Sequence, residues 1–103
     1  MWRDKGLQTG DVIALQADTG LYLSRIARGD TNPIEAEKDS IDPYSQFTVT
    51  VLDNNKVALQ ADTGLYLSRI NRGDTNPIEA EKDSIDPYSQ FTITLIQSSR
   101  TLG

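Results

Sequence analysis

The sequence predicts an all-β protein made of two repeats of four strands each, and two observations carry this prediction. First, residues 13–52 recur at 57–96 with a constant offset of 44 positions and five substitutions. A period of about 20 to 50 residues is typical of folds built by repeating one supersecondary unit. Second, apolar and polar side chains alternate with a period of two through most of each repeat, as they do in half-buried strands.

The alternation divides each repeat into four strands separated by turn-forming residues. Two strands of the second repeat flank Asp62–Gly64 as a hairpin, because glycine there can take a positive φ. Loops that contain Asn-Pro and Asp-Pro separate the remaining strands. Asp53–Asn55 between the repeats predicts a tight hairpin turn. The expected strands are 13–17, 21–26, 34–38 and 45–52 in the first repeat, and 57–61, 65–70, 78–82 and 89–96 in the second.

Composition argues against several classes of function. The 103-residue chain has a net charge of −5 and no basic cluster, so we expect no nucleic acid and no anionic membrane as a partner. It has neither cysteine nor histidine, the residues of most zinc sites and of the commonest general base. We therefore expect no cofactor, no metal and no catalytic residue. The chain as given has no membrane-spanning stretch and no signal peptide, which predicts a soluble protein of unknown location.

The expected core follows from the apolar face of each strand. Four of the five substitutions between the repeats exchange one aliphatic side chain for another, which buried positions tolerate when volume is kept. The expected core residues are Leu15, Leu23, Ile26, Ile34, Phe47, Val49 and Val51, with Leu59, Leu67, Ile70, Ile78, Phe91, Ile93 and Leu95.

Two motifs resemble the leaves of β-trefoil proteins. TGLYL at 63–67 is similar to the TG-x-YL hairpin of such leaves, and DPYSQFTV at 42–49 is similar to the D-P-x-x-Q-F-x-V segment of amaranthin-type agglutinins. The second motif is also similar to the Q-F strand of growth-factor-like and designed symmetric trefoils. The chain departs from ricin-type lectins, which carry Gln-x-Trp, because Gln46 and Phe47 are adjacent and the only tryptophan is Trp2. The resemblance covers both repeats and implies a trefoil with lectin-like binding, though without the ricin-type sugar site.

The number of leaves predicts an oligomer. We treat 1–103 as one all-β unit, with the first repeat at 13–56 and the second at 57–100. A trefoil needs three leaves, so two leaves leave strand edges that favour association. Three chains supply six leaves, enough for two trefoils, which predicts a homotrimer with a leaf boundary crossing between chains at the Asp53–Lys56 connection.

Several polar motifs are candidates for ligand binding. Arg-Gly-Asp at 28–30 and 72–74 resembles an integrin ligand, although a polar turn is the favoured interpretation. Asp-Thr-Asn-Pro at 30–33 and 74–77 offers oxygens to calcium or sugar hydroxyls, but it lacks calcium-loop spacing and is favoured as an Asx turn. Alternation places the paired acids of 35–42 and 79–86 on a solvated face, which argues against glycoside hydrolysis. The four tyrosines, Tyr22, Tyr44, Tyr66 and Tyr88, either stack on sugar rings or pack at the leaf edge.

These observations favour a non-catalytic, agglutinin-like protein that binds glycans at equivalent sites on its leaves, where multiplicity converts weak binding into avidity. The alternative is a designed or reconstructed symmetric scaffold with no natural ligand, because the exposed loops of the two repeats have hardly diverged. The expected ligand-binding residues are Asp30, Thr31, Asn32 and Tyr22, with Asp74, Thr75, Asn76 and Tyr66.

Overall fold

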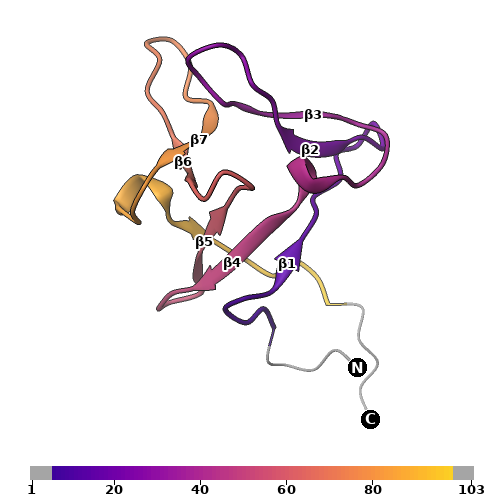
Figure 1. Cartoon of the computed structure of the whole chain (residues 1–103). Coiled ribbons are helices and arrows are strands. Elements are labelled where there is room, and N and C mark those ends of the chain that lie inside the picture. The colour runs from indigo at the N-terminus through magenta and orange to yellow at the C-terminus, as the bar shows by residue number, and fades with distance from the viewer. Residues whose placement is uncertain (1–5, 99–103) are drawn as a thin grey trace.

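The computed structural model describes residues 6–98, which form an all-β protein without an α-helix among them. Trp2 and both ends of the predicted 1–103 unit lie outside the described residues. One sheet follows the order β1-β4-β5-β6-β7, with β8 paired to β5, and β2 and β3 form a second sheet (Figure 1). The all-β prediction is confirmed, and neither sheet closes on itself. The strands are β1 (Val12–Ile13), β2 (Tyr22–Arg25), β3 (Ile34–Lys38), β4 (Phe47–Val51), β5 (Lys56–Gln60), β6 (Tyr66–Arg69), β7 (Ile78–Lys82) and β8 (Phe91–Thr92).

The two repeats have the same strand pairing. In the first repeat β1 pairs with β4, where Ile13 lies opposite Phe47. In the second repeat β5 pairs with β8, where Val57 lies opposite Phe91. The β2–β3 and β6–β7 hairpins also share one register, including an irregularity after the first residue of β2 and of β6. Contacts formed within a repeat are thus set by its own sequence.

The turn that joins the repeats has the predicted form. The amide of Lys56 donates to the carbonyl of Asp53 at 3.3 Å. Asn54 and Asn55 have φ values of 63° and 62°, and a type I′ turn requires positive φ at both central positions. Asparagine tolerates this conformation better than most other residues. The turn sets β4 and β5 in antiparallel register over four positions.

The last strand of each repeat begins later than predicted, because a short 3₁₀ turn precedes it. These turns are η1 (Pro43–Ser45) and η2 (Pro87–Ser89). At η1 the Asp42 carboxylate accepts hydrogen bonds from the amides of Tyr44 and Ser45, and the Ser45 hydroxyl accepts one from the Asp42 amide at 2.8 Å. This reciprocal capping satisfies donors that the turn would otherwise leave free. Residues 45 and 89 therefore belong to the turns and not to the strands.

The first strand of the first repeat and the last strand of the second are also shorter than predicted. β8 ends at Thr92, although a strand was expected to 96, and the Ile93 amide donates to the Asn55 carbonyl at 2.9 Å. β1 ends at Ile13, after which Gln16 and the first residue of β2 form an isolated bridge. Each of these strands pairs with a single strand, β1 with β4 and β8 with β5, so each lacks a second neighbour among the described residues.

The core lies along β4, β5 and β6. Its buried residues are Phe47, Val49, Val57, Ala58, Leu59, Ala61, Leu67 and Ala80. Of the other predicted core residues, Leu23, Ile26, Ile34, Ile70, Ile78 and Phe91 are half-buried. The core prediction is wrong for Leu15, Val51, Ile93 and Leu95, which are exposed. Val51 precedes the turn between the repeats, and the other three follow β1 or β8, each of which pairs with only one strand.

Candidate functional site

The predicted ligand loops form the tips of the β2–β3 and β6–β7 hairpins. The amide of Arg28 donates to the carbonyl of Thr31 at 2.9 Å, which closes a turn in which Gly29 has a φ of 75°. Thr75 makes the equivalent contact in the second repeat. Asp30 and Asp74 are exposed at these tips. Each Arg-Gly-Asp sequence is thus a polar turn with glycine at positive φ, as the sequence favoured.

The arginine of each Arg-Gly-Asp sequence is held in an ion pair. Arg28 donates from Nε and Nη2 to the Glu35 carboxylate at 2.7 and 2.6 Å. Arg72 binds Glu79 in the same way, at 2.8 and 2.6 Å. Hydrogen bonds from the guanidinium lower the pKa of Glu35 and of Glu79. A general acid of a glycosidase needs a raised pKa, so these carboxylates are poorly suited to that chemistry.

Asn32, at the base of the first loop, belongs to a polar cluster that sequence reasoning missed. The Nη1 of Arg25 donates to the Oδ1 of Asn32 at 2.7 Å, and its Nε and Nη2 donate to the Asp62 carboxylate at 2.7 and 3.0 Å. The side chains of Arg25 and Asp62 are 12% and 23% exposed. Hydrogen bonding with Asp62 raises the pKa of Arg25 and lowers that of Asp62. Because Asp62 lies in the second repeat, this ion pair also joins the two repeats.

An exposed tyrosine lies beside Arg25. The guanidinium of Arg25 is 5.4 Å from the centre of the Tyr44 ring, and the ammonium of Lys38 is 5.1 Å from it. Both distances lie within the range of cation–π interactions. Lys38 also donates to Asp42 at 2.8 Å, while the Tyr44 residue remains 45% exposed. We call Arg25, Asn32, Lys38, Asp42 and Tyr44 the first tyrosine cluster.

The second tyrosine cluster, Arg69, Asn76, Lys82, Asp86 and Tyr88, repeats this arrangement. Arg69 donates to Asn76 at 2.8 Å, and Lys82 donates to Asp86 at 2.8 Å. The guanidinium of Arg69 and the ammonium of Lys82 lie 5.2 and 5.4 Å from the centre of the Tyr88 ring. Tyr88 is 53% exposed. The clusters differ at one point: within residues 6–98, no carboxylate forms an ion pair with Arg69.

The structure does not bring Tyr22 and Tyr66 to the predicted loops. Tyr22 begins β2, opposite Lys38, whereas the loop with Asp30 follows the other end of that strand. Tyr66 has the same relation to Asp74. The tyrosine linked to Asn32 is instead Tyr44, through Arg25. The Asp-Pro-Tyr-Ser sequence was the available signal, because its capped turn fixes the backbone that carries the exposed ring.

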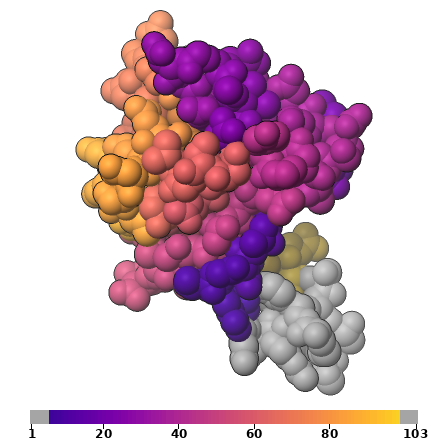
Figure 2. All heavy atoms as spheres, in the orientation of Figure 1, coloured from indigo at the N-terminus to yellow at the C-terminus, as the bar shows by residue number. Residues whose placement is uncertain are grey.

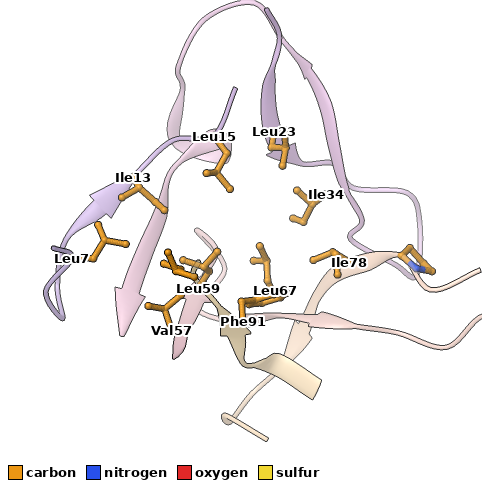
Figure 3. A pocket seen from close by; sticks show the side chains of 12 residues that line it. Leu7, Ile13, Leu15, Leu23, Ile34, Val57, Leu59, Leu67, Ile78 and Phe91 are labelled. Carbon is orange, nitrogen blue, oxygen red and sulfur yellow. The ribbon is translucent and has the colours of Figure 1, made fainter. Parts of the chain in front are cut away.

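An apolar cavity of about 450 Å³ lies between the two repeats. Figure 3 shows that side chains from both repeats point into it, among them Leu15 and Ile34 from the first and Ile78 and Phe91 from the second. All of its lining residues are apolar. Such a space lacks the directional polar groups that orient a sugar, so the tyrosine clusters are the better candidates for glycan contacts.

Comparison of the chain with protein families, curated proteins and solved structures gave no match. Among the described residues, no three acidic side chains are grouped so that they could hold a metal ion. The same part of the chain contains no helix with the length and apolarity needed to cross a membrane. The two tyrosine clusters are therefore the candidate functional site.

Proposed function

We propose that this protein is a β-trefoil-type binding module that recognises carbohydrate at its two tyrosine clusters and catalyses no reaction. The observation that carries the proposal is the repetition of one exposed ring with the same amide and charged neighbours in both repeats. Two equivalent shallow sites suit a ligand that is itself repetitive, because simultaneous binding multiplies weak affinities.

The chemistry of each cluster suits a sugar. The exposed ring of Tyr44 offers an apolar surface for the C–H face of a pyranose, and the amide of Asn32 and carboxylate of Asp42 offer donors and acceptors to its hydroxyls. In the first cluster Arg25 and Lys38 are already paired with carboxylates. Balanced charge there favours a neutral glycan over an anionic one.

The trefoil assignment is supported by the strand arrangement. The first and last strands of each repeat pair with each other, and β4 pairs with the first strand of the next repeat. If a third repeat paired its first and last strands in the same way, with its first strand also paired with β8 and its last strand with β1, the sheet would close into a ring of six strands. Each leaf would contribute two of them.

The alternative is a symmetric scaffold without a ligand, and one observation favours it. In the first cluster Arg25 and Lys38 are already paired with carboxylates, and among the described residues no buried side-chain nitrogen or oxygen lacks a partner. A site built for a ligand often leaves some groups free until the ligand binds.

A glycan array probed with the labelled chain separates the two proposals. We expect binding to a neutral glycan that Tyr44→Ala/Tyr88→Ala weakens at least tenfold, while the matched Tyr44→Phe/Tyr88→Phe variant, which keeps both rings, retains it. Circular dichroism must show that all variants are folded. A folded wild-type chain that binds nothing on the array would favour the scaffold.

A further inference from the structure

We infer that the two open faces of this protein, around Leu15 on the first repeat and around Ile93 on the second, are interfaces for further copies of the same chain, built on the contacts that already join its own two repeats. These interfaces do not depend on sugar binding. Residues that are identical in the two repeats differ in environment, because one of each pair faces the other repeat and its equivalent faces solvent.

Burial shows where a neighbour is missing. Leu59 is 9% exposed, whereas its equivalent Leu15 is 38% exposed. Ala80 is 1% exposed, whereas Ala36 is exposed to solvent. The side chain of Glu79 is 5% exposed, and that of Glu35 is 33% exposed. The first repeat covers these positions of the second repeat. No residue within 6–98 covers the equivalent positions of the first repeat.

The junction between the repeats gives the contacts that a neighbour would make. The Ala80 amide donates to the Asn32 carbonyl at 2.9 Å, and Pro33 forms a bridge with Glu79. The space-filling view shows the loop that contains these first-repeat residues lying against the second repeat (Figure 2). The same contact can form between two chains if the second repeat of one chain meets the first repeat of another. Each residue is then replaced by its equivalent in the other repeat, and the Ala36 amide of one chain donates to the Asn76 carbonyl of the other.

Charge provides an independent argument for the same partner. The ion pair between Arg25 and Asp62 joins the repeats at 2.7 Å. Shifted by one repeat, it becomes a pair between Arg69 of one chain and Asp18 of another. Both residues are exposed, and neither forms an ion pair within residues 6–98. The two open faces of the chain therefore carry one charge of each sign at matching positions.

The pairing of β4 with β5 predicts how strands of two chains would pair. Within the chain Val49 lies opposite Leu59, and Val51 lies opposite Val57. The shifted pairs place Ile93 opposite Leu15 of another chain and Leu95 opposite its Ile13. Ile93 and Leu95 are 48% and 66% exposed, and this pairing would cover them. The neighbour's apolar face would also fill the cavity between the repeats, which is lined by apolar side chains alone (Figure 3).

The stoichiometry of three rests on the trefoil part of the proposed function. If three repeats complete one trefoil, three chains carry enough repeats for two trefoils. Two of the chains each place both repeats in one trefoil. The third chain opens at Asp53–Lys56 and contributes one repeat to each trefoil. Two of the chain-to-chain contacts then place residue 93 opposite residue 15. The expected mass is about 34 kDa, three times the 11.4 kDa of one chain.

Cross-linking tests the register directly, because the chain has no cysteine of its own. Opposed residues of antiparallel strands lie within the Cα separation that a disulfide spans. Oxidised Leu15→Cys/Ile93→Cys should migrate as a covalent trimer on a denaturing gel, because two such bonds link three chains. The matched control, Val49→Cys/Leu59→Cys, should form mainly bonds within one chain.

A charge swap tests the interface without new bonds. Arg69→Asp and Asp18→Arg should each lower the mass measured by light scattering, because each brings like charges together between chains. The combined Arg69→Asp/Asp18→Arg chain should recover part of the lost mass, because it restores the two pairs between residues 69 and 18. The contacts of residue 18 with Arg25 and of residue 69 with Asp62 at the other two chain boundaries stay mismatched. A monomeric wild-type chain, or a disulfide between positions 15 and 93 of one and the same chain, would overturn the interface. A covalent ladder that continues past three chains would overturn the closed trimer. A wild-type chain that forms the trimer but binds no glycan would count against the sugar proposal alone.

Discussion

Phe47 and Phe91 occupy the same position in the two repeats, but Phe47 is fully buried and Phe91 is only half-buried. The difference comes from their strands. β4, which carries Phe47, lies between β1 and β5, whereas β8, which carries Phe91, pairs only with β5. One side chain in one local sequence therefore has two environments, and this pair makes a sensitive probe of packing.

Phe47→Ala should lower the free energy of unfolding by about 3–5 kcal/mol, because it removes a fully buried ring and leaves a cavity. Phe91→Ala should cost less in the dissociated chain, since part of that ring already contacts water. Urea denaturation followed by circular dichroism, at a concentration where light scattering shows monomers, measures both. Equal losses in the monomer would contradict the burial difference.

Ser45→Ala should lower the free energy of unfolding by about 1–3 kcal/mol, because the buried hydroxyl is the acceptor for the Asp42 amide. Ser89→Ala should have the same effect at the equivalent turn. The control is Ser40→Ala, an exposed position where a change within about 0.5 kcal/mol is expected. If all three variants unfold at the same urea concentration as the wild type, the capping contacts contribute nothing measurable.

Asn54→Ala and Asn55→Ala should each cost roughly 1–2 kcal/mol, because alanine is strained at the positive φ that both positions adopt. Asn55→Gly should preserve or raise stability, since glycine is favoured at the second central position of a type I′ turn. Thermal unfolding of the three variants gives the comparison. A loss on glycine substitution as large as the loss on alanine substitution would show that the asparagine side chain, and not the backbone conformation, matters.

Stability should fall in acid. Asp62 has a pKa lowered from its ordinary value of 3.8 by its hydrogen bonds and charge interaction with Arg25. A carboxylate with a lowered folded pKa stabilises the fold fully above the unfolded value, and this contribution is lost as the pH falls through the folded value. Urea midpoints between neutral pH and about pH 2 should therefore drop most steeply below about pH 4.

Asp62→Asn should show a shallower acid loss than the wild type, because it has no carboxylate to protonate at the ion pair. Asp39→Asn, which changes an exposed loop carboxylate, should keep the wild-type slope. Parallel pH profiles for the wild type and Asp62→Asn would mean that the Arg25 pair does not contribute to stability.

Asp30→Ala/Asp74→Ala should weaken glycan binding severalfold while leaving unfolding unchanged, because both carboxylates are exposed at the hairpin tips, two residues before the asparagines of the tyrosine clusters. Binding measured by calorimetry with a glycan found on the array provides the test. If the variant binds the glycan as tightly as the wild type, the sugar contacts lie in the tyrosine clusters and the aspartates at the hairpin tips make none.

Features set by short segments could be predicted from the sequence. The all-β class, the hairpins and the turn at Asn54–Asn55 depend on alternation and on turn residues a few positions apart. The 3₁₀ turn before Phe47 was missed, although its Asp-Pro-x-Ser sequence holds the whole cap. The alternation of the following residues continues toward the N-terminus and so predicts a strand that begins too early.

Features that depend on distant neighbours could not be predicted in the same way. Leu15 and Leu59 have the same flanking residues, so no local rule assigns them different exposure. The ion pair between Arg25 and Asp62 joins residues 37 positions apart, and their meeting follows from how the repeats pack. For the same reason the predicted site paired Asn32 with Tyr22, whereas Arg25 links it to Tyr44.

The two-residue turn between β4 and β5 also bears on the order of folding. Its partner strands are adjacent in sequence, so little chain entropy is lost when they meet, and hairpins of this kind form in about 1–10 μs. The pairing of Val12 with Thr48 must close a loop of 36 residues, and the pairing of Lys56 with Thr92 spans the same length. Contacts across longer loops form later. We therefore expect the chain to fold from its middle outward, with β1 and β8 added last.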